Sequence, residues 1–467
     1  MRTPFLFLGA PARWLTFGLL LFACSNVFGG WRVGFAAANI TPKEPVMLSG
    51  YASRTTPADG VLDELYAKAM ALEDESGAQA LVITADLIGF RAEFAEGICE
   101  RITATTGIPR ERILLNASHI HSGPSVMLDK VAHDTVNEEQ AVKLIAYTRK
   151  FQDQCVALAG DALKKLQQAR LSWGGGVVNF PMNRREFTER GVILGVNPRG
   201  PVDRGVPVLR VETLEGKLLG VLFGAACHNT TFGSKDNQVS PDFAGYAQKH
   251  VETEHPGVQA MFVIGLAGDA NPYPNSHNDP GKRPAVEIAR QHGAELGREV
   301  VRVLATTTLK PVNGPLRTVY AMAELPLQPP PAKEELEKSV AKAGSWQKWV
   351  AAKMLAEQQG GKTPATHFSA PVAVWQFGEG LTWVGLSGEV VVDYAALIER
   401  AIGPLNLWLS GYCNDAFGYV PSARVLQEGG YETRGLYSRG VGYFAPEAEH
   451  VLVEKVAELA RQVARPR

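Results

Sequence analysis

The stretch ILLNASHIHSGP, residues 113–124, joins a short apolar run to a polar segment that contains two histidines. The run Ile113 to Leu115 is typical of a buried β-strand. His119 and His121 follow it, two positions apart. On an extended segment alternate side chains face the same side, so both imidazole rings would reach one point. The pair is a weak signal by itself, because two structural histidines give the same pattern.

Four other apolar runs end in the same manner, in small and polar residues. They lead into residues 226–229, 268–272, 387–389 and 410–415. Active sites of α/β sheets gather beyond strand ends, so we expect these segments to lie close together. His228 and Glu389 would then join the His119 and His121 pair. Two or three histidines, one carboxylate and an open position for water form a catalytic zinc site.

Two further residues at these segments each allow two interpretations. Arg184, in the sequence NRR at 183–185, either holds an oxygen of a substrate or pairs with a surface carboxylate. Asp269 either stabilises its own turn or orients a histidine that binds metal. The residue types alone leave both questions open.

Apolar periodicity predicts alternating strands and helices along the rest of the chain. Helices are expected over residues 91–106, 141–168, 243–250, 285–304, 334–359 and 447–463. Strands are expected within 78–87, 113–115, 206–211, 218–226, 261–266, 372–377 and 381–385. Two pairs of these strands form hairpins, while helices separate others. The pattern therefore predicts an α/β fold with mixed sheets, flanking helices and a metal site at strand ends.

Residues 1–30 have the features of a signal peptide. Arg2 and Arg13 are basic, and the apolar run over residues 14–24 is shorter than the roughly 20 residues that span a membrane. Small residues near position 29 predict cleavage before or after Gly30 and export to the periplasm or the cell exterior. An uncleaved anchor, or a lipoprotein modified at Cys24, is the alternative.

Composition excludes several classes of protein. The chain of 467 residues has 45% hydrophobic and 20% charged residues, which argues against intrinsic disorder. With 47 basic and 48 acidic residues the net charge is -1, and no basic run marks a nucleic-acid partner. Four cysteines remain after residue 30, and we favour buried free thiols over disulfides for them, namely Cys99, Cys155, Cys227 and Cys413.

Taken together, the motifs resemble the neutral/alkaline, non-lysosomal ceramidase family. The matching pieces occur in order along nearly the whole chain after residue 30, and SHIHSGP is the most specific. They are ANITP at 38–42, SGY at 49–51, SHIHSGP at 118–124, Asn183-Arg184, His228, GDANP at 268–272, Gly388-Glu389, 411–414 and Tyr431-Glu432.

The resemblance implies a zinc-dependent amidohydrolase of lipid, and specifically sphingolipid, metabolism. It implies that His119, His228 and Glu389 bind Zn²⁺ and that His121 lies beside the reacting carbonyl. It further implies that Arg184 contacts the site and that residues 31–467 form the catalytic domain. The partner would be a small-molecule or lipid N-acyl substrate. Peripheral contact of the protein with a membrane is compatible with such a substrate.

Three features depart from the family's pattern. Ala416 stands where the family has a fourth zinc ligand, a tyrosine, and Asp415 or Tyr419 is the candidate replacement. Asn271 stands where the family has a serine, and we count it among the catalytic residues. A C-terminal immunoglobulin-like domain is not expected.

We therefore expect an exported zinc hydrolase of a carbon–nitrogen amide bond, with its natural substrate open. Two alternatives use the same site. One is a zinc-dependent esterase, and the other is a secreted binding protein with a degenerate metal site.

Overall fold

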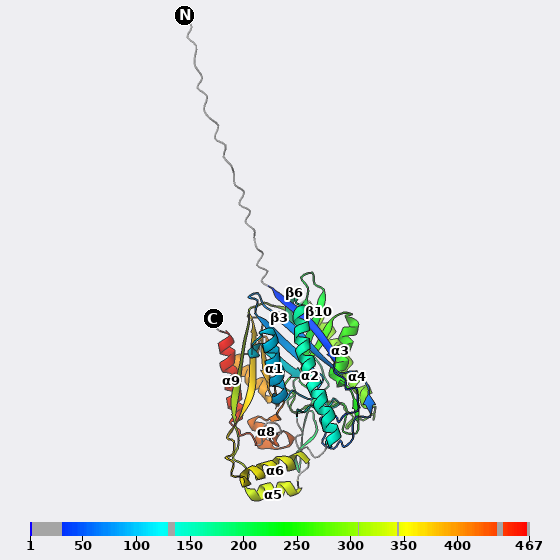
Figure 1. The fold of residues 1–467 in the computed structure, drawn as a ribbon, viewed down its shortest axis with the longest axis vertical. Coiled ribbons are helices and arrows are strands. Elements are labelled where there is room, and N and C mark those ends of the chain that lie inside the picture. Colours follow the sequence, from blue (N-terminus) through cyan, green and yellow to red (C-terminus); the bar gives the residue numbers. More distant parts are fainter. Residues whose placement is uncertain (2–29, 129–135, 307, 343–344, 437–441, 465–467) are drawn as a thin grey trace.

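The computed structural model describes Met1 and residues 30–128, 136–306, 308–342, 345–436 and 442–464 (Figure 1). The expected signal peptide lies almost entirely outside the described residues. In the part of the chain that the structure describes, no helix is both long and apolar enough to cross a membrane.

The largest sheet has nine strands and mixes parallel with antiparallel pairs. Eight of them follow the order β12-β10-β9-β6-β1-β3-β4-β5, and β14 (Lys310–Val312) also pairs with β6. Their bounds are β1 Trp31–Asn39, β3 Tyr66–Glu73, β4 Gln79–Ala85, β5 Ile113–Ala117, β6 Gln167–Val177, β9 Gly205–Glu212, β10 Leu218–Ala225 and β12 Gln259–Ile264. The two outer pairs, β4 with β5 and β10 with β12, are parallel.

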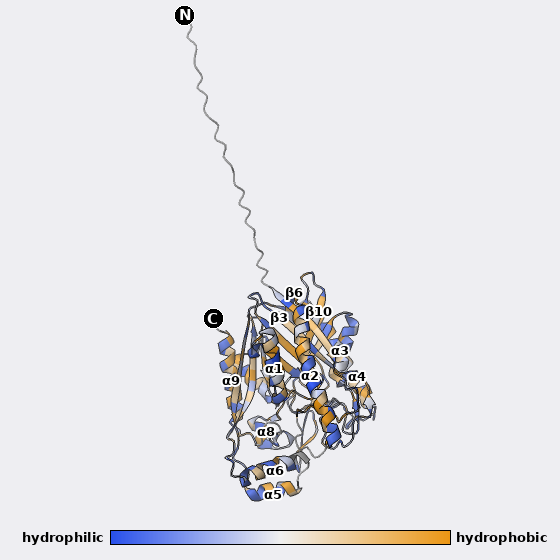
Figure 2. Ribbon diagram, in the orientation of Figure 1, coloured by the Kyte–Doolittle hydropathy of each residue, from blue (hydrophilic) through white to orange (hydrophobic). Residues whose placement is uncertain are grey.

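Four helices cover one face of this sheet. The helices α1 (Ala92–Thr106) and α2 (Glu138–Lys164) pack on the β1, β3, β4 and β5 half. The helices α3 (Asp242–Glu254) and α4 (Ala285–Leu304) pack on the β9, β10 and β12 half. Figure 2 shows hydrophobic and hydrophilic residues interleaved along α2, as expected where only one face of a helix is buried.

A second sheet packs against the other face of the first. It contains β15 (Leu316–Pro326), β16 (His367–Phe377), β17 (Leu381–Leu386) and β19 (Leu407–Ser410) in that order. Along β16, Trp375 faces the first sheet, whereas Val372 and Val374 face α7 (Asp393–Ile402) and α9 (Ala448–Ala464). This alternation produces four layers: helices, sheet, sheet, helices.

The predicted α/β class, with mixed sheets and flanking helices, is confirmed, and α4 has the predicted bounds. Two helix predictions were wrong in detail. The helix expected over 141–168 ends at Lys164, because β6 begins at Gln167. The stretch expected to be one helix over 334–359 contains two, α5 (Lys333–Lys342) and α6 (Ser345–Gln359), which share a small core of their own at the lower end of Figure 1.

The prediction of free, buried thiols is confirmed. Cys99, Cys155, Cys227 and Cys413 are all unpaired and 0% exposed. Cys24 lies outside the described residues.

Candidate metal centre and active site

The five predicted strand ends meet on one side of the molecule. Asn116, at the end of β5, bridges to Cys413 beyond β19. Ile120 bridges to Asn229 beyond β10, and the N–H of Gly268 beyond β12 donates to the carbonyl of Val390. Segments that are more than 100 residues apart in sequence therefore lie side by side.

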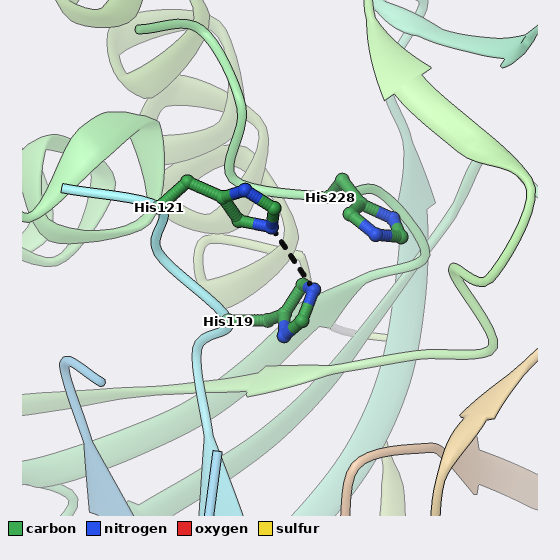
Figure 3. Close-up of side chains that lie close together, drawn as sticks. All are labelled: His119, His121 and His228. Atoms are coloured by element: carbon green, nitrogen blue, oxygen red, sulfur yellow. Dashed lines mark hydrogen bonds between the residues drawn. The ribbon is translucent and has the colours of Figure 1, made fainter. Parts of the chain in front are cut away.

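Three imidazole rings converge there: those of His119, His121 and His228 (Figure 3). One ring nitrogen from each lies within 4.8 Å of the others. His119 and His228 are almost fully buried, whereas His121 is partly exposed. The segment that carries His119 is not extended as we expected, because His119 has a φ of 61°. The left-handed turn brings His121 Nε2 to 3.2 Å from His119 Nε2.

Glu389 completes this group. It lies in β18 (Glu389–Val390), which follows a left-handed glycine at position 388. Its Oε2 is 3.1 Å from His228 Nε2 and 3.3 Å from His119 Nε2. Ligands about 2.0–2.1 Å from a tetrahedral metal lie about 3.3–3.4 Å from one another. The spacing of these donor atoms therefore fits a zinc-sized ion.

Backbone carbonyls fix the orientation of two of the rings. The carbonyl of Ile88 lies 2.6 Å from His119 Nδ1, and that of Ala267 lies 2.7 Å from His228 Nδ1. A carbonyl can only accept, so each Nδ1 carries the proton and each Nε2 keeps its lone pair for a metal. His121 differs, because its buried Nδ1 has no hydrogen-bond partner among the described residues.

The charges of the site also suit a metal, which needs neutral imidazoles and an ionised carboxylate. Burial lowers the pKa of His228 to about 4, helped by the charge of Arg184. Burial and the neighbouring His119 and His228 lower the pKa of His121 well below its usual value. Burial opposes ionisation of Glu389, yet His119 and His228 hold its pKa well below the ordinary range.

Arg184 and Asn271 lie together beside the histidines. Arg184 Nη1 donates to Asn271 Oδ1 at 3.2 Å, and Thr230 Oγ1 lies 3.3 Å from the same oxygen. The guanidinium group also lies 5.4 Å from the ring of Tyr419 and 5.6 Å from that of Tyr431. Arg184 is 4% exposed, so the surface ion pair that the sequence left open does not describe it.

The other candidates have defined places. Asp269 joins two neighbouring segments, since its two oxygens accept from the Val392 N–H and the Asn183 side-chain amide. The carbonyl of Ala267, and not Asp269, orients His228. Asp415 Oδ1 accepts from the Ala92 N–H at the start of α1, whereas the ring of Tyr419 stacks on His228 at 6.4 Å.

Two neighbours had no role in the sequence interpretation. The ring of Tyr412 lies 4.4 Å from that of His119, and its hydroxyl lies 3.5 Å from His228 Nδ1. Glu432 binds Arg184 Nε at 2.9 Å. Both lie in motifs that were recognised, but nothing in the sequence shows which side chains they contact.

The chain belongs to the neutral/alkaline non-lysosomal ceramidase family, whose N-terminal sequence profile matches residues 31–277. Neutral ceramidase from Pseudomonas aeruginosa is 25% identical over 266 residues, which cover 54% of this chain and 38% of that protein. Neutral ceramidase from Drosophila melanogaster is 24% identical over 250 residues, covering 52% and 35%. The matched region is thus less than half the length of these relatives.

Solved structures agree on the fold. The crystal structure of neutral ceramidase from Pseudomonas aeruginosa superposes with a TM-score of 0.70 at 20% identity, covering 92% of this chain and 74% of that one. A structure titled "Ceramidase complexed with C2" gives the same TM-score and identity.

Proposed function

We propose that this protein is a zinc-dependent hydrolase that cleaves the amide bond of an N-acyl amine, in the manner of a ceramidase. The observation that carries the proposal is the donor set of His119, His228 and Glu389, with the two imidazole tautomers fixed for metal binding. Family membership supports amide hydrolysis. Zinc bound there would polarise the carbonyl and lower the pKa of a water molecule.

His121 is the proposed proton carrier. Its Nε2 lies 3.2 Å from His119 Nε2 and so borders the metal position. Its Nδ1 lacks a partner among the described residues, and because His119 Nε2 keeps its lone pair, the proton shared by the two rings belongs to His121 Nε2. The neutral ring can accept a proton from the attacking water and return it to the leaving amine.

Asn271 and Arg184 are the proposed hydrogen-bond donors to the substrate oxygen. Arginine nitrogens cannot accept hydrogen bonds, so the Asn271 atom that faces Arg184 must be the carbonyl oxygen. The Nδ2 group of Asn271 then points away from Arg184 and is available as a donor. A positioned donor of this kind stabilises charge that develops on a carbonyl oxygen.

Two substitutions shape the substrate proposal. Ala416 and Asn271 replace two hydroxyl groups that the family pattern has, and either Asp415 or Tyr419 would have to compensate at the metal. We therefore propose a shorter or more polar N-acyl amine than ceramide. Ala416 also supports one competing function, a binding protein that retains the metal but lacks turnover.

The test compares ceramide with short-chain N-acyl amines and the matching esters, using the zinc-loaded protein. We expect amide cleavage that is faster on the short substrates and that is abolished by a chelator and by His121→Ala. Efficient cleavage of ceramide would contradict the substrate proposal. Ester cleavage alone would identify an esterase, and zinc binding without turnover of any substrate would identify the binding protein.

We further propose that the chain is exported and is cleaved near Gly30. The basic residues, short apolar run and small residues of positions 1–30 support this proposal. N-terminal sequencing of the protein from the periplasm or medium tests it, and intact Met1 in the cytoplasm would contradict it.

A further inference from the structure

Glu432 holds two arginines that are adjacent in the sequence. Its Oε1 lies 2.9 Å from Arg184 Nε, and its Oε2 lies 2.6 Å from Arg185 Nη1. Glu432 and Arg185 are each 1% exposed, and Arg184 is 4% exposed. The three side chains form a buried clamp with Glu432 at its centre.

A β-bulge lies beside this clamp. Arg184 and Arg185 lie in β7 (Pro181–Thr188), which pairs with β8 (Gly191–Asn197), and the register shifts between Asn183 and Arg185. Two residues of β8, Gly195 and Val196, stand opposite Arg184, so the extra residue belongs to β8. A bulge of this kind increases the local twist of the two paired strands. The side chain of Asn183 accepts from the Arg185 N–H, and Asp269 O accepts from the Arg184 N–H, so the β7 backbone opposite the bulge remains paired.

The segment that carries Glu432 approaches the hairpin closely. Gly429 and Gly430 have φ angles of 73° and 101°. A Cβ on Gly430 would lie 3.1 Å from Val192 Cγ1 and 3.3 Å from Arg185 Nη1. Only glycine allows both the backbone conformation and this approach.

The two arginines have different second contacts. Arg185 Nη2 donates to Glu428 Oε2 at 3.1 Å and to the Gly429 carbonyl at 2.7 Å. Arg184 donates from Nη1 to Asn271. Burial alone would raise the pKa of Glu432, but Arg184 and Arg185 hold it below its usual value. The carboxylate therefore stays charged between them.

We infer that Glu432 is a positioning residue for the reaction: it fixes the guanidinium of Arg184 so that Nη1 meets Asn271 beside the substrate carbonyl. Arg185 fastens Glu432 from the other side and does not contact the site itself. This inference rests on the proposed amide hydrolysis. Glu432 acts only through Arg184, since its oxygens bind the two arginines and not the histidines.

The test uses Glu432→Asp in the full mature chain, because the shorter side chain keeps the charge that the buried arginines require. We expect kcat/KM for a short-chain N-acyl amine to fall by about 10²-fold, the loss typical of a reacting group displaced by about 1 Å. Zinc content should not change. The matched control is Glu252→Asp on α3, which shortens the side chain that pairs with Lys68 of β3, and it should leave kcat/KM unchanged.

A double-mutant cycle separates positioning from general stability. In an Arg184→Lys background, Glu432→Asp should cost less than threefold in kcat/KM, because the group through which it acts has already been changed. Independent, multiplicative losses would overturn the inference.

A crystal structure of Glu432→Asp gives a readout that does not depend on turnover. The Arg184 guanidinium should move away from Asn271 Oδ1, and an unmoved guanidinium would overturn the inference. If the wild-type protein hydrolyses no amide, the proposed function fails, while this structure still decides whether Glu432 positions Arg184.

Discussion

The carbonyls of Ile88 and Ala267 fix the tautomers of His119 and His228, so that each Nε2 has its lone pair free for a metal. The sequence identified the histidines, because His119 and His228 follow apolar runs that become strands β5 and β10. It could not identify the carbonyls, since every residue has one. The left-handed φ of His119 could not be predicted from the sequence either, because the local pattern favoured an extended segment.

We predict that the His228→Ala variant does not bind zinc, whereas the His121→Ala variant does. His228 presents the lone pair of a fixed Nε2 to the metal position, whereas no backbone carbonyl orients the ring of His121. Elemental analysis of the two purified variants measures the difference, with circular dichroism as the check on folding. Full zinc occupancy in His228→Ala would contradict the ligand assignment.

Asp86 gives a pH-dependent prediction. Burial raises its pKa from 3.8 to about 6, although it accepts from the Tyr66 N–H and from Ser118 Oγ. The folded protein therefore binds a proton more tightly than the unfolded chain. The resulting stability is complete below pH 4 and is lost as the pH rises through 6. At about 1.4 kcal/mol per pKa unit, the change is about 3 kcal/mol.

The measurement compares urea unfolding of wild type and Asp86→Asn across this range. The stability of the wild type relative to the variant should fall by about 3 kcal/mol between pH 4 and pH 7. Taking the difference cancels the titration of all other groups that the two proteins share. A constant difference would show that Asp86 has an ordinary pKa in the folded protein.

Among elements, the long helices and the most continuous apolar strands were predictable, whereas β3, β6, β15 and α7 were not. The helix α4 has the predicted bounds because its apolar residues repeat at helical spacing. Strand β6 was missed, since its sequence QQARLSWGGGV contains three successive glycines that are typical of a turn. It forms a strand because β1, β9 and β14 pair with it, and such pairing is not visible in local sequence.

A further prediction concerns the segment between α8 (Ala423–Glu428) and the 3₁₀ helix Tyr431–Thr433. Gly430→Ala should cost more stability than Gly257→Ala. Both glycines have positive φ, which costs other residues about 1–2 kcal/mol, but only at Gly430 would the added Cβ meet neighbours. Gly430→Ala should also lower kcat/KM, because it displaces Glu432. Equal unfolding free energies for the two variants would contradict the close approach.

The molecule as a whole encloses both sheets between helices. Strands β4, β5 and β10 therefore bury both faces, which explains why they are continuous apolar runs in the sequence. The same enclosure removes all four described cysteines from solvent. Burial raises the pKa of Cys99 to about 12 and that of Cys413 to about 11.

These thiols give a prediction for the intact protein. A thiol reagent such as Ellman's reagent should react with none of them in the folded protein and with all four in urea. A chain that keeps residues 1–30 would show a fifth, because Cys24 lies in that segment. The count therefore reports processing as well as burial. Fewer than four thiols in urea would mean that some have formed disulfides.

The register shift between β7 and β8 makes regular strand pairing and catalysis competing requirements during evolution. The extra residue of this shift lies in β8, where Gly195 and Val196 stand opposite Arg184. Losing one codon at positions 195–196 would therefore restore regular pairing with β7 and remove the distortion beside the two arginines. A deletion scan through this hairpin should therefore find chains that stay folded but lose turnover. If the shortened chains kept turnover, the hairpin's length would not be under selection for catalysis.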